Sequence, residues 1–252
     1  MSASAIPQEG PSLDVPFVPT PPAVVDRMLQ MVDVKPGDFV IDLGSGDGRI
    51  AIAAAKKGAR ALGVDIDPER VREARENARK AGVEDKVTFR QENLFDTRIV
   101  EATVVTMYLL PDVNMRLRPR ILDELKPGTR VVSHAFDLVD WKADQYAEVG
   151  HRRIFMWVVP AKVAGRWLVQ GGPESFTLVL QQKFQRIEGS VETGGQTVQI
   201  GDGNLRGTEI RFTLPDGRIF RGGVAGDRME ALPATAGDND NTMRGWRATK
   251  AP

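Results

Sequence analysis

Glycine occupies alternate positions at 44, 46 and 48, and aspartates stand at positions 42 and 47. Glycine lets a backbone approach a bound ligand closely, and the free N–H groups at the start of a following helix attract anionic groups. A further carboxylate, Asp65, ends the next apolar run, where nucleoside-binding α/β folds reach ribose hydroxyls. A glycine-rich turn alone can be purely structural, but the two features together predict a nucleoside-cofactor site.

The spacing of these glycines distinguishes between cofactors. A dinucleotide-binding loop reads G-x-G-x-x-G, whereas this one reads Gly44-x-Gly46-x-Gly48. The carboxylates of Asp42 and Asp47 would repel a pyrophosphate, but they suit a ligand that carries an ammonium and a sulfonium. S-adenosylmethionine is such a ligand. The loop therefore favours S-adenosylmethionine, and an NAD-linked dehydrogenase becomes a distant alternative.

The elements that must position these residues alternate between strands and helices. Apolar runs predict strands at 40–43, 61–65, 87–91, 102–108 and 130–133. Helical patterns lie between them, at 50–57, 68–81 and 114–125. A last strand at 153–159 is expected to run antiparallel. The order predicts an α/β fold, a doubly wound Rossmann-like sheet that is mostly parallel with one antiparallel strand.

Two further segments are interpreted from their composition. Four prolines make residues 16–22 extended, and Thr20 is predicted to cap the helix that follows. This segment is either a strap on the sheet edge or a lid over the cofactor, in which case Phe17 and Thr20 lie near the ligand. The many charges of the 68–81 helix, Arg70 among them, are interpreted as a solvated face.

Four stretches resemble, in order, motifs of the class I S-adenosylmethionine-dependent methyltransferases, and within them the small archaeal protein-lysine methyltransferases and their mitochondrial relatives. The stretches are PFVPTP at 16–21, DLGSGDGR at 42–49, ATVVTMYLL at 102–110 and PGTRVVSH at 127–134. The resemblance covers residues 14–160. It implies an S-adenosylmethionine site and, by extension, a protein-lysine acceptor.

The resemblance also implies roles for individual residues. The cofactor loop corresponds to Asp42, Gly44, Ser45, Gly46, Asp47 and Gly48, and the ribose acid to Asp65. Asn93 matches the acceptor for the adenine amino group, with Leu94 and Ile66 against the ring. The family often has aspartate where this chain has Asn93, but an amide oxygen can also accept a hydrogen bond.

The acceptor of the methyl group is less constrained. The tetrapeptide Asn-Pro-Pro-Tyr, typical of enzymes that methylate planar amide or base nitrogens, is absent. Tyr108, at the end of the apolar strand, is expected to line the acceptor slot. His134 ends the next strand, either as a structural hydrogen-bonding residue or as a base. Three functions stay open: a protein-lysine methyltransferase, a small-molecule methyltransferase, and a protein that binds the nucleoside without turnover.

Composition argues against several classes of protein. Lys plus Arg and Asp plus Glu both number 34, so the net charge is zero. The protein therefore has no overall positive potential to attract a polyanion, and no nucleic-acid partner is expected. The absence of cysteine and the presence of two histidines argue against a metal site. No run of about 18 apolar residues occurs, so no membrane span is predicted. We expect a cytoplasmic protein, although an exported precursor with a removed N-terminal segment stays open.

The composition and the hydrophobic pattern of the sequence change after Pro160. We expect a flexible tail at 1–13, an S-adenosylmethionine-binding methyltransferase domain at 14–160 and an all-β accessory domain at 161–252. Fifteen of the 25 glycines fall in the last part, between short alternating runs. These runs predict a small antiparallel sandwich or barrel that serves either packing or dimerisation, or recognition of a ligand or substrate. The sequence does not predict the oligomeric state.

Overall fold

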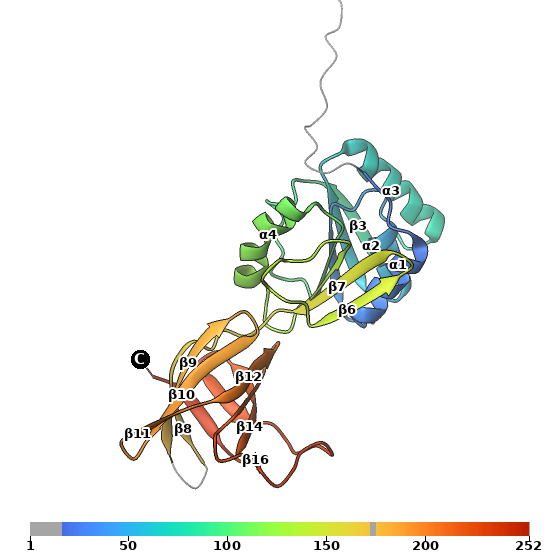
Figure 1. Cartoon of the computed structure of the whole chain (residues 1–252). Helices are drawn as coiled ribbons and strands as arrows, with labels where there is room; N and C mark the ends of the chain where they lie inside the picture. Colours follow the sequence, from blue (N-terminus) through green and yellow to red (C-terminus); the bar gives the residue numbers. More distant parts are fainter. Residues whose placement is uncertain (1–16, 172–174, 252) are drawn as a thin grey trace, which may run out of the picture. The chain divides into compact units, whose positions relative to one another are not determined.

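The computed structural model describes residues 17–171 and 175–251, which form two compact units (Figure 1). One unit contains the residues up to Leu125 together with Thr129–Trp157. The other contains Lys126–Gly128 and the residues from Val158 onward. The tail expected at 1–13 lies outside the described residues.

The first unit is built on a seven-stranded sheet with the strand order β3-β2-β1-β4-β5-β7-β6. Strands β1 to β5 pair in parallel, whereas β6 and β7 are antiparallel to each other. Their bounds are β1 Phe39–Leu43, β2 Arg60–Asp65, β3 Val87–Gln91, β4 Val104–Met107, β5 Arg130–His134, β6 Gln145–Val149 and β7 Arg152–Val158. The predicted mostly parallel α/β sheet is confirmed, but β6 was not predicted.

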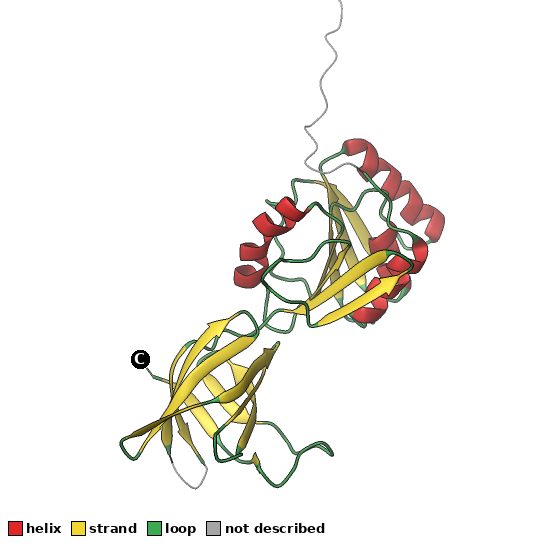
Figure 2. Cartoon of the chain, viewed as in Figure 1, coloured by secondary structure: helices red, strands yellow, loops and turns green. Residues whose placement is uncertain are grey.

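Four helices cover this sheet: α1 Pro22–Met31, α2 Arg49–Lys56, α3 Pro68–Ala81 and α4 Pro111–Glu124. Parallel crossovers are right-handed. The steps from β1 to β2 and from β2 to β3 run in one direction along the sheet, whereas the step from β4 to β5 runs in the other. Helices α2 and α3 therefore lie on one face and α4 on the opposite face (Figure 2).

Local sequence explains where two of these helices begin and end. The Asp67 carboxylate accepts a hydrogen bond from the Glu69 amide at the start of α3, and Gly82 ends the helix with a left-handed φ of 65°. Helix α4 begins at Pro111, three residues before its expected start at Asn114, because proline favours the first turn of a helix. None of the helices in residues 17–171 and 175–251 is long and apolar enough to span a membrane.

The second unit is a closed antiparallel barrel, which resolves the predicted choice between sandwich and barrel. Eight strands form the ring β8-β9-β10-β12-β13-β14-β15-β17, which closes because β17 pairs with β8 and β10 with both β9 and β12. The bounds are β8 Gly165–Gln170, β9 Phe176–Lys183, β10 Arg186–Thr193, β11 Gln196–Gln199, β12 Gly201–Arg206, β13 Glu209–Thr213, β14 Ile219–Ala225, β15 Arg228–Ala231, β16 Thr242–Met243 and β17 Arg247–Lys250. Strand β11 extends β10, and β16 pairs with β14.

Large aromatic side chains fill the barrel interior. Trp167, Phe212, Phe220 and Trp246 are each at most 2% exposed, and the Phe212 and Phe220 rings stack with centroids 4.8 Å apart. An eight-stranded barrel is just wide enough for side chains to fill it. Gly222 leaves room for the Trp246 ring, since a Cβ at that position would lie 2.6 Å from it. The buried aromatic and aliphatic side chains of these strands therefore form one packed core.

Replacing Trp246 with alanine is expected to destabilise the barrel by about 3–5 kcal/mol, because it removes a buried aromatic ring and leaves a cavity. Hydrogen exchange of peptides from β13 and β14, followed by mass spectrometry in the full-length protein, measures the loss. Leu168→Ala is the control, since Leu168 is 49% exposed on the same barrel. Equal exchange in the two variants would contradict the packed core.

Candidate functional site

The candidate site lies where the strand order of the sheet reverses. Strand β1 pairs with β2 on one side and with β4 on the other, and ligands of open α/β sheets bind at the carboxyl ends of strands at such a point. A pocket opens there. Twelve predicted site residues line it: Phe17, Thr20, Asp42, Gly44, Ser45, Gly46, Asp47, Asp65, Ile66, Asn93, Leu94 and Tyr108. Two others, Gly48 and His134, are not among the lining residues.

The loop of residues 44–48, called the glycine loop, is hydrogen-bonded to the end of β2. Gly44, Gly46 and Gly48 have left-handed φ values of 74°, 52° and 82°. The amides of Gly44 and Ser45 both donate to the Val64 carbonyl, at 3.0 and 2.8 Å. Gly48 is the N-cap residue of α2 and is buried, and a Cβ on it would lie 2.6 Å from the Phe89 ring. Gly48 therefore serves packing, whereas Gly44 and Gly46 face the pocket.

Asp65 ties the glycine loop to the start of α3. One carboxylate oxygen accepts a hydrogen bond from the Gly46 amide at 2.8 Å, and the other accepts from the Asp67 amide at 3.0 Å. The carboxylate is thus fixed in orientation at the pocket wall. Each oxygen retains a lone pair with which it can accept from a ligand hydroxyl.

Asp42 is buried at the base of the pocket, with 2% of its surface exposed. It stands opposite Thr106 in the β1–β4 register, and the Thr106 hydroxyl donates to its Oδ1 at 2.6 Å. Burial raises the pKa of the Asp42 carboxyl to about 7; the hydrogen bond from Thr106 opposes this rise, and the nearby Asp65 and Asp47 carboxylates add to it. Its Oδ2 and the Ser45 hydroxyl are buried without a partner in the described residues.

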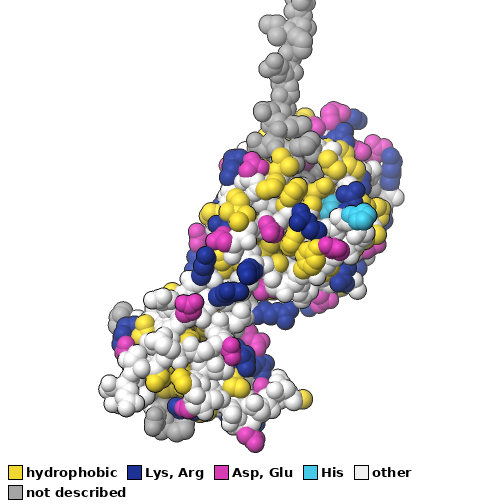
Figure 3. All heavy atoms as spheres, viewed as in Figure 1, with side chains coloured by type: hydrophobic (Ala, Val, Ile, Leu, Met, Phe, Trp, Pro, Cys, Tyr) yellow, Lys and Arg dark blue, Asp and Glu magenta, His cyan; other side chains and the backbone are white. Residues whose placement is uncertain are grey.

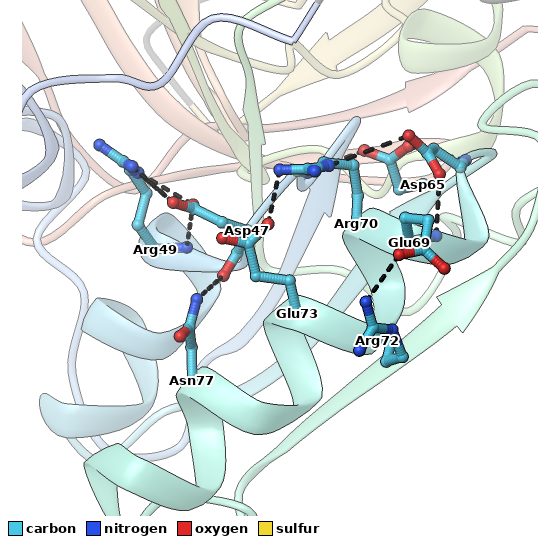
Figure 4. A network of polar contacts seen from close by, with 10 residues as sticks. Asp47, Arg49, Asp65, Glu69, Arg70, Arg72, Glu73 and Asn77 are labelled. Carbon is cyan, nitrogen blue, oxygen red and sulfur yellow. Dashed lines mark hydrogen bonds and ion pairs between the residues drawn. The ribbon is translucent and has the colours of Figure 1, made fainter.

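Asp47, by contrast, is held by an arginine (Figure 4). The Arg49 guanidinium donates from Nε to Oδ1 of Asp47 at 2.9 Å and from Nη2 to Oδ2 at 2.5 Å. The Asn77 side chain donates to the Asp47 backbone carbonyl at 3.0 Å. The negative charge of Asp47 is therefore compensated, whereas Asp42 and Asp65 have no such ion pair among the described residues.

Within the described part of the proline-rich segment, residues 17–20 line the pocket, and Phe17 contacts the glycine loop. A Cβ on Gly46 would lie 2.4 Å from the Phe17 ring, and the Arg70 guanidinium lies 4.8 Å from the centroid of that ring. The interpretation of the α3 charges as a solvated face is therefore wrong for Arg70, which lines the pocket. It holds for Arg72, whose side chain is 72% exposed.

The predicted capping role of Thr20 is also wrong. Pro21 is the N-cap residue of α1, and no side chain caps this helix. The Thr20 hydroxyl instead makes a hydrogen bond of 3.1 Å with Nδ1 of His134, at the end of β5. This hydrogen bond thus joins the proline-rich segment to the end of β5, although the two residues lie far apart in the sequence.

The residues predicted to contact adenine follow β2 and β3, whereas Tyr108, predicted to line the acceptor slot, follows β4. Ile66 and Leu94 are half-buried in the pocket wall, and the Asn93 side-chain oxygen accepts from the Phe95 amide at 2.9 Å. Tyr108 is half-buried after β4, with its ring centroid 3.9 Å from that of His134. The Asn93 oxygen still has one lone pair with which to accept.

His134 lies behind Tyr108 and is fully buried. Burial lowers the pKa of its imidazole to about 4, and the positive charge of Arg152 acts in the same direction. The ring is therefore neutral near pH 7, and its Nε2 has no partner among the described residues. This placement supports the structural alternative for His134 rather than its use as a base.

Sequence reasoning missed several pocket residues, including Arg49, Glu92 and Leu109. Arg49 follows the glycine loop directly, and Glu92 and Leu109 follow β3 and β4, so their positions at strand ends were available as a signal. Five carboxyl groups line the pocket, Asp42, Asp47, Asp65, Asp67 and Glu92, against two arginines. The pocket is consequently suited to a cationic ligand.

A sheet with this strand order and an acid-flanked glycine loop at its switch point defines the class I S-adenosylmethionine-dependent methyltransferases. The profile of the ANTKMT methyltransferase domain matches residues 42–145. The chain is 50% identical to a protein-lysine N-methyltransferase of Saccharolobus islandicus over 137 residues, which are 54% of this chain and 85% of that protein. It therefore belongs to the family of small archaeal and mitochondrial protein-lysine methyltransferases, with an added C-terminal barrel.

Two further relatives widen the comparison. The adenine nucleotide translocase lysine N-methyltransferase of Mus musculus is 34% identical over 58% of this chain and 64% of its own length. A solved structure of an RNA methyltransferase from Salinibacter ruber in complex with S-adenosyl-L-homocysteine is 52% identical, with a TM-score of 0.57. It covers 58% of this chain and 96% of its own. A fold of this kind thus occurs without the barrel.

Proposed function

We propose that this protein transfers the methyl group of S-adenosylmethionine to the side-chain amine of a lysine in another protein. The observation that carries the acceptor is the 50% identity to a protein-lysine N-methyltransferase across 85% of that relative. The pocket supports it, because its carboxyl groups outnumber its arginines and so attract both a cationic cofactor and a cationic lysine side chain.

The pocket residues fit S-adenosylmethionine. Asp65 is oriented to accept from the ribose hydroxyls, and the unpartnered Asp42 Oδ2 and Ser45 hydroxyl are suited to the amino-acid portion. Ile66 and Leu94 would flank the adenine, with Asn93 accepting from its amino group. When bound, the cofactor supplies a methyl group on a positively charged sulfur, which a neutral amine attacks directly.

The chain has to bring a neutral amine into line with that methyl group. A lysine with a pKa near 10.4 needs roughly 4.6 kcal/mol to lose its proton at pH 7. Transfer from water into an apolar slot disfavours the charged form of lysine by several pKa units. We place this slot at Tyr108 and Leu109, which line the pocket after β4. Their role is to orient the amine and exclude water.

A second candidate acceptor is RNA, because the solved relative with 52% identity is described as an RNA methyltransferase. The zero net charge weakens this alternative, and Figure 3 shows acidic and basic side chains interspersed over the visible face. A small-molecule acceptor is the third candidate. We place the reaction in the cytoplasm, where S-adenosylmethionine is made.

Transfer of a tritiated methyl group to a cell lysate distinguishes these acceptors. Label that protease releases and that acid hydrolysis yields as methyl-lysine supports the proposal. Label that nuclease releases indicates RNA, label in small solutes indicates a metabolite, and no label indicates a binding protein; each of these overturns the lysine acceptor. Asp65→Ala serves as the inactive control.

Cofactor affinity is expected to rise more than tenfold between pH 5.5 and pH 7. The pKa of the Asp42 carboxyl is about 7 in the free protein, so the group is mostly protonated at pH 5.5. An ammonium against Oδ2 favours the ionised form, so binding releases a proton and strengthens as pH rises. Titration calorimetry at the two pH values measures the change.

Asp42→Asn is the matched control, because it keeps the size of the side chain and cannot ionise. The ligand's α-amino group has a pKa near 8 and stays protonated across this range. The variant should bind with nearly constant affinity between pH 5.5 and pH 7. A pH dependence as steep as that of the unmodified protein would assign the effect to another group.

A further inference from the structure

Arg49 makes contacts in two directions at the pocket rim. Nε and Nη2 form a two-pronged pair with the Asp47 carboxylate, while Nη1 donates to the Thr20 backbone carbonyl at 2.8 Å. Figure 4 shows the pair with Asp47. A guanidinium offers five donors in a rigid plane, so one side chain can serve both partners at once. A lysine ammonium carries the same charge but lacks this planar geometry.

The Asp47 side of this contact is fixed to the protein framework. The Asp47 carbonyl accepts from the Asn77 side chain at 3.0 Å, which fastens the glycine loop to α3. Arg49 itself is the first residue of α2. The backbone of Arg49 is therefore fixed in α2, and its guanidinium is oriented by the Asp47 carboxylate toward the proline-rich segment.

The proline-rich segment, in contrast, depends on side chains for its position. Pro19 and Pro21 have no amide hydrogen to donate. Residues 17–20 are held by the Phe17 ring against Gly46 and Arg70, by the Thr20–His134 hydrogen bond and by the Arg49 contact to the Thr20 carbonyl. The same residues line the pocket, so the segment forms part of the wall that a cofactor contacts.

We infer that Arg49 is a positioning residue that holds the segment 17–20 closed against the cofactor pocket, so that it slows release of the bound cofactor. It acts through the segment and through Asp47 and does not react itself. This inference rests on the cofactor assignment made above and is independent of which acceptor is methylated. It assigns to the arginine that follows the glycine loop a role in retaining the ligand.

Arg49→Lys tests the inference in the full-length protein, with S-adenosylmethionine as the ligand. Loss of a charge-assisted hydrogen bond should raise the dissociation constant about tenfold, mainly through faster dissociation measured by stopped flow. The turnover rate at saturating S-adenosylmethionine should change by a much smaller factor than the KM for S-adenosylmethionine. Arg72→Lys is the control, because Arg72 pairs with Glu69 on the exposed face of α3. Circular dichroism verifies that both variants are folded.

A double-variant cycle with Phe17→Ala separates the segment from a purely local effect on the glycine loop. If Arg49 acts through the segment, its effect on the dissociation rate should shrink once the Phe17 anchor is gone. Two independent effects that multiply in the double variant would overturn the inference. So would an Arg49→Lys variant whose dissociation rate matches that of Arg72→Lys. Neither result bears on the lysine acceptor, which the labelling experiment tests separately.

Discussion

Replacing Asp65 with alanine is expected to weaken binding of S-adenosylmethionine by a factor of about one hundred or more. The carboxylate accepts from the Gly46 and Asp67 amides at 2.8 and 3.0 Å, and we assign to it the ribose hydroxyls. A hydrogen bond to a charged group contributes about 1.5–3 kcal/mol, so losing two to the ribose corresponds to this factor. The Gly46 amide, a loop donor, also loses its acceptor. Calorimetric titration of the full-length protein measures the affinity.

Two further variants make this result interpretable. Glu101→Ala removes a carboxylate that is 64% exposed and is not among the residues that line the pocket, so this variant should bind the cofactor normally. Asp65→Asn keeps the size of the side chain and one oxygen acceptor, so its affinity should fall between those of Asp65→Ala and the unmodified protein. Circular dichroism shows whether each variant is folded. An affinity of folded Asp65→Ala within threefold of the original would remove the ribose assignment.

The core of the site could be predicted because its rules are local. The carboxyl ends of parallel strands share one edge of the sheet, so Gly44 after β1, Asp65 at the end of β2 and Asn93 after β3 had to converge once the strands were identified. The same reasoning explains Tyr108 after β4. The closed barrel was only half predicted, because closure depends on pairings such as β17 with β8, which short-range patterns do not encode.

The contacts that position the proline-rich segment could not be predicted in this way, because they join residues that are far apart in the sequence. Thr20 is of a residue type favoured as a helix cap, yet its hydroxyl bonds to His134, 114 residues away. Arg70 belongs to a helix face that is mostly solvated, yet its guanidinium lies over the Phe17 ring and it lines the pocket. Strand β6 was missed for a different reason. It is an edge strand with an exposed Tyr146 and no buried residue, so its hydrophobic signal is weak.

Replacing Gly46 with alanine is expected to reduce cofactor affinity at least tenfold, a larger effect than the backbone conformation alone would cause. The residue has a φ of 52°, where an alanine costs roughly 1–2 kcal/mol. In addition, the new Cβ would lie 2.4 and 2.8 Å from two carbons of the Phe17 ring. Because both distances are below any normal contact, the ring has to move, and the wall formed by the segment 17–20 moves with it.

Gly82→Ala separates the two contributions. Gly82 ends α3 with a φ of 65°, and nothing lies within 4 Å of a Cβ built there, so this variant carries the backbone strain without the clash. It should lose a similar amount of stability in chemical denaturation while binding S-adenosylmethionine as before. If instead both alanine variants bound the cofactor equally well, the contact between Phe17 and the glycine loop would have no bearing on the pocket. A selective loss in Gly46→Ala would show that the loop and the proline-rich segment form one binding wall.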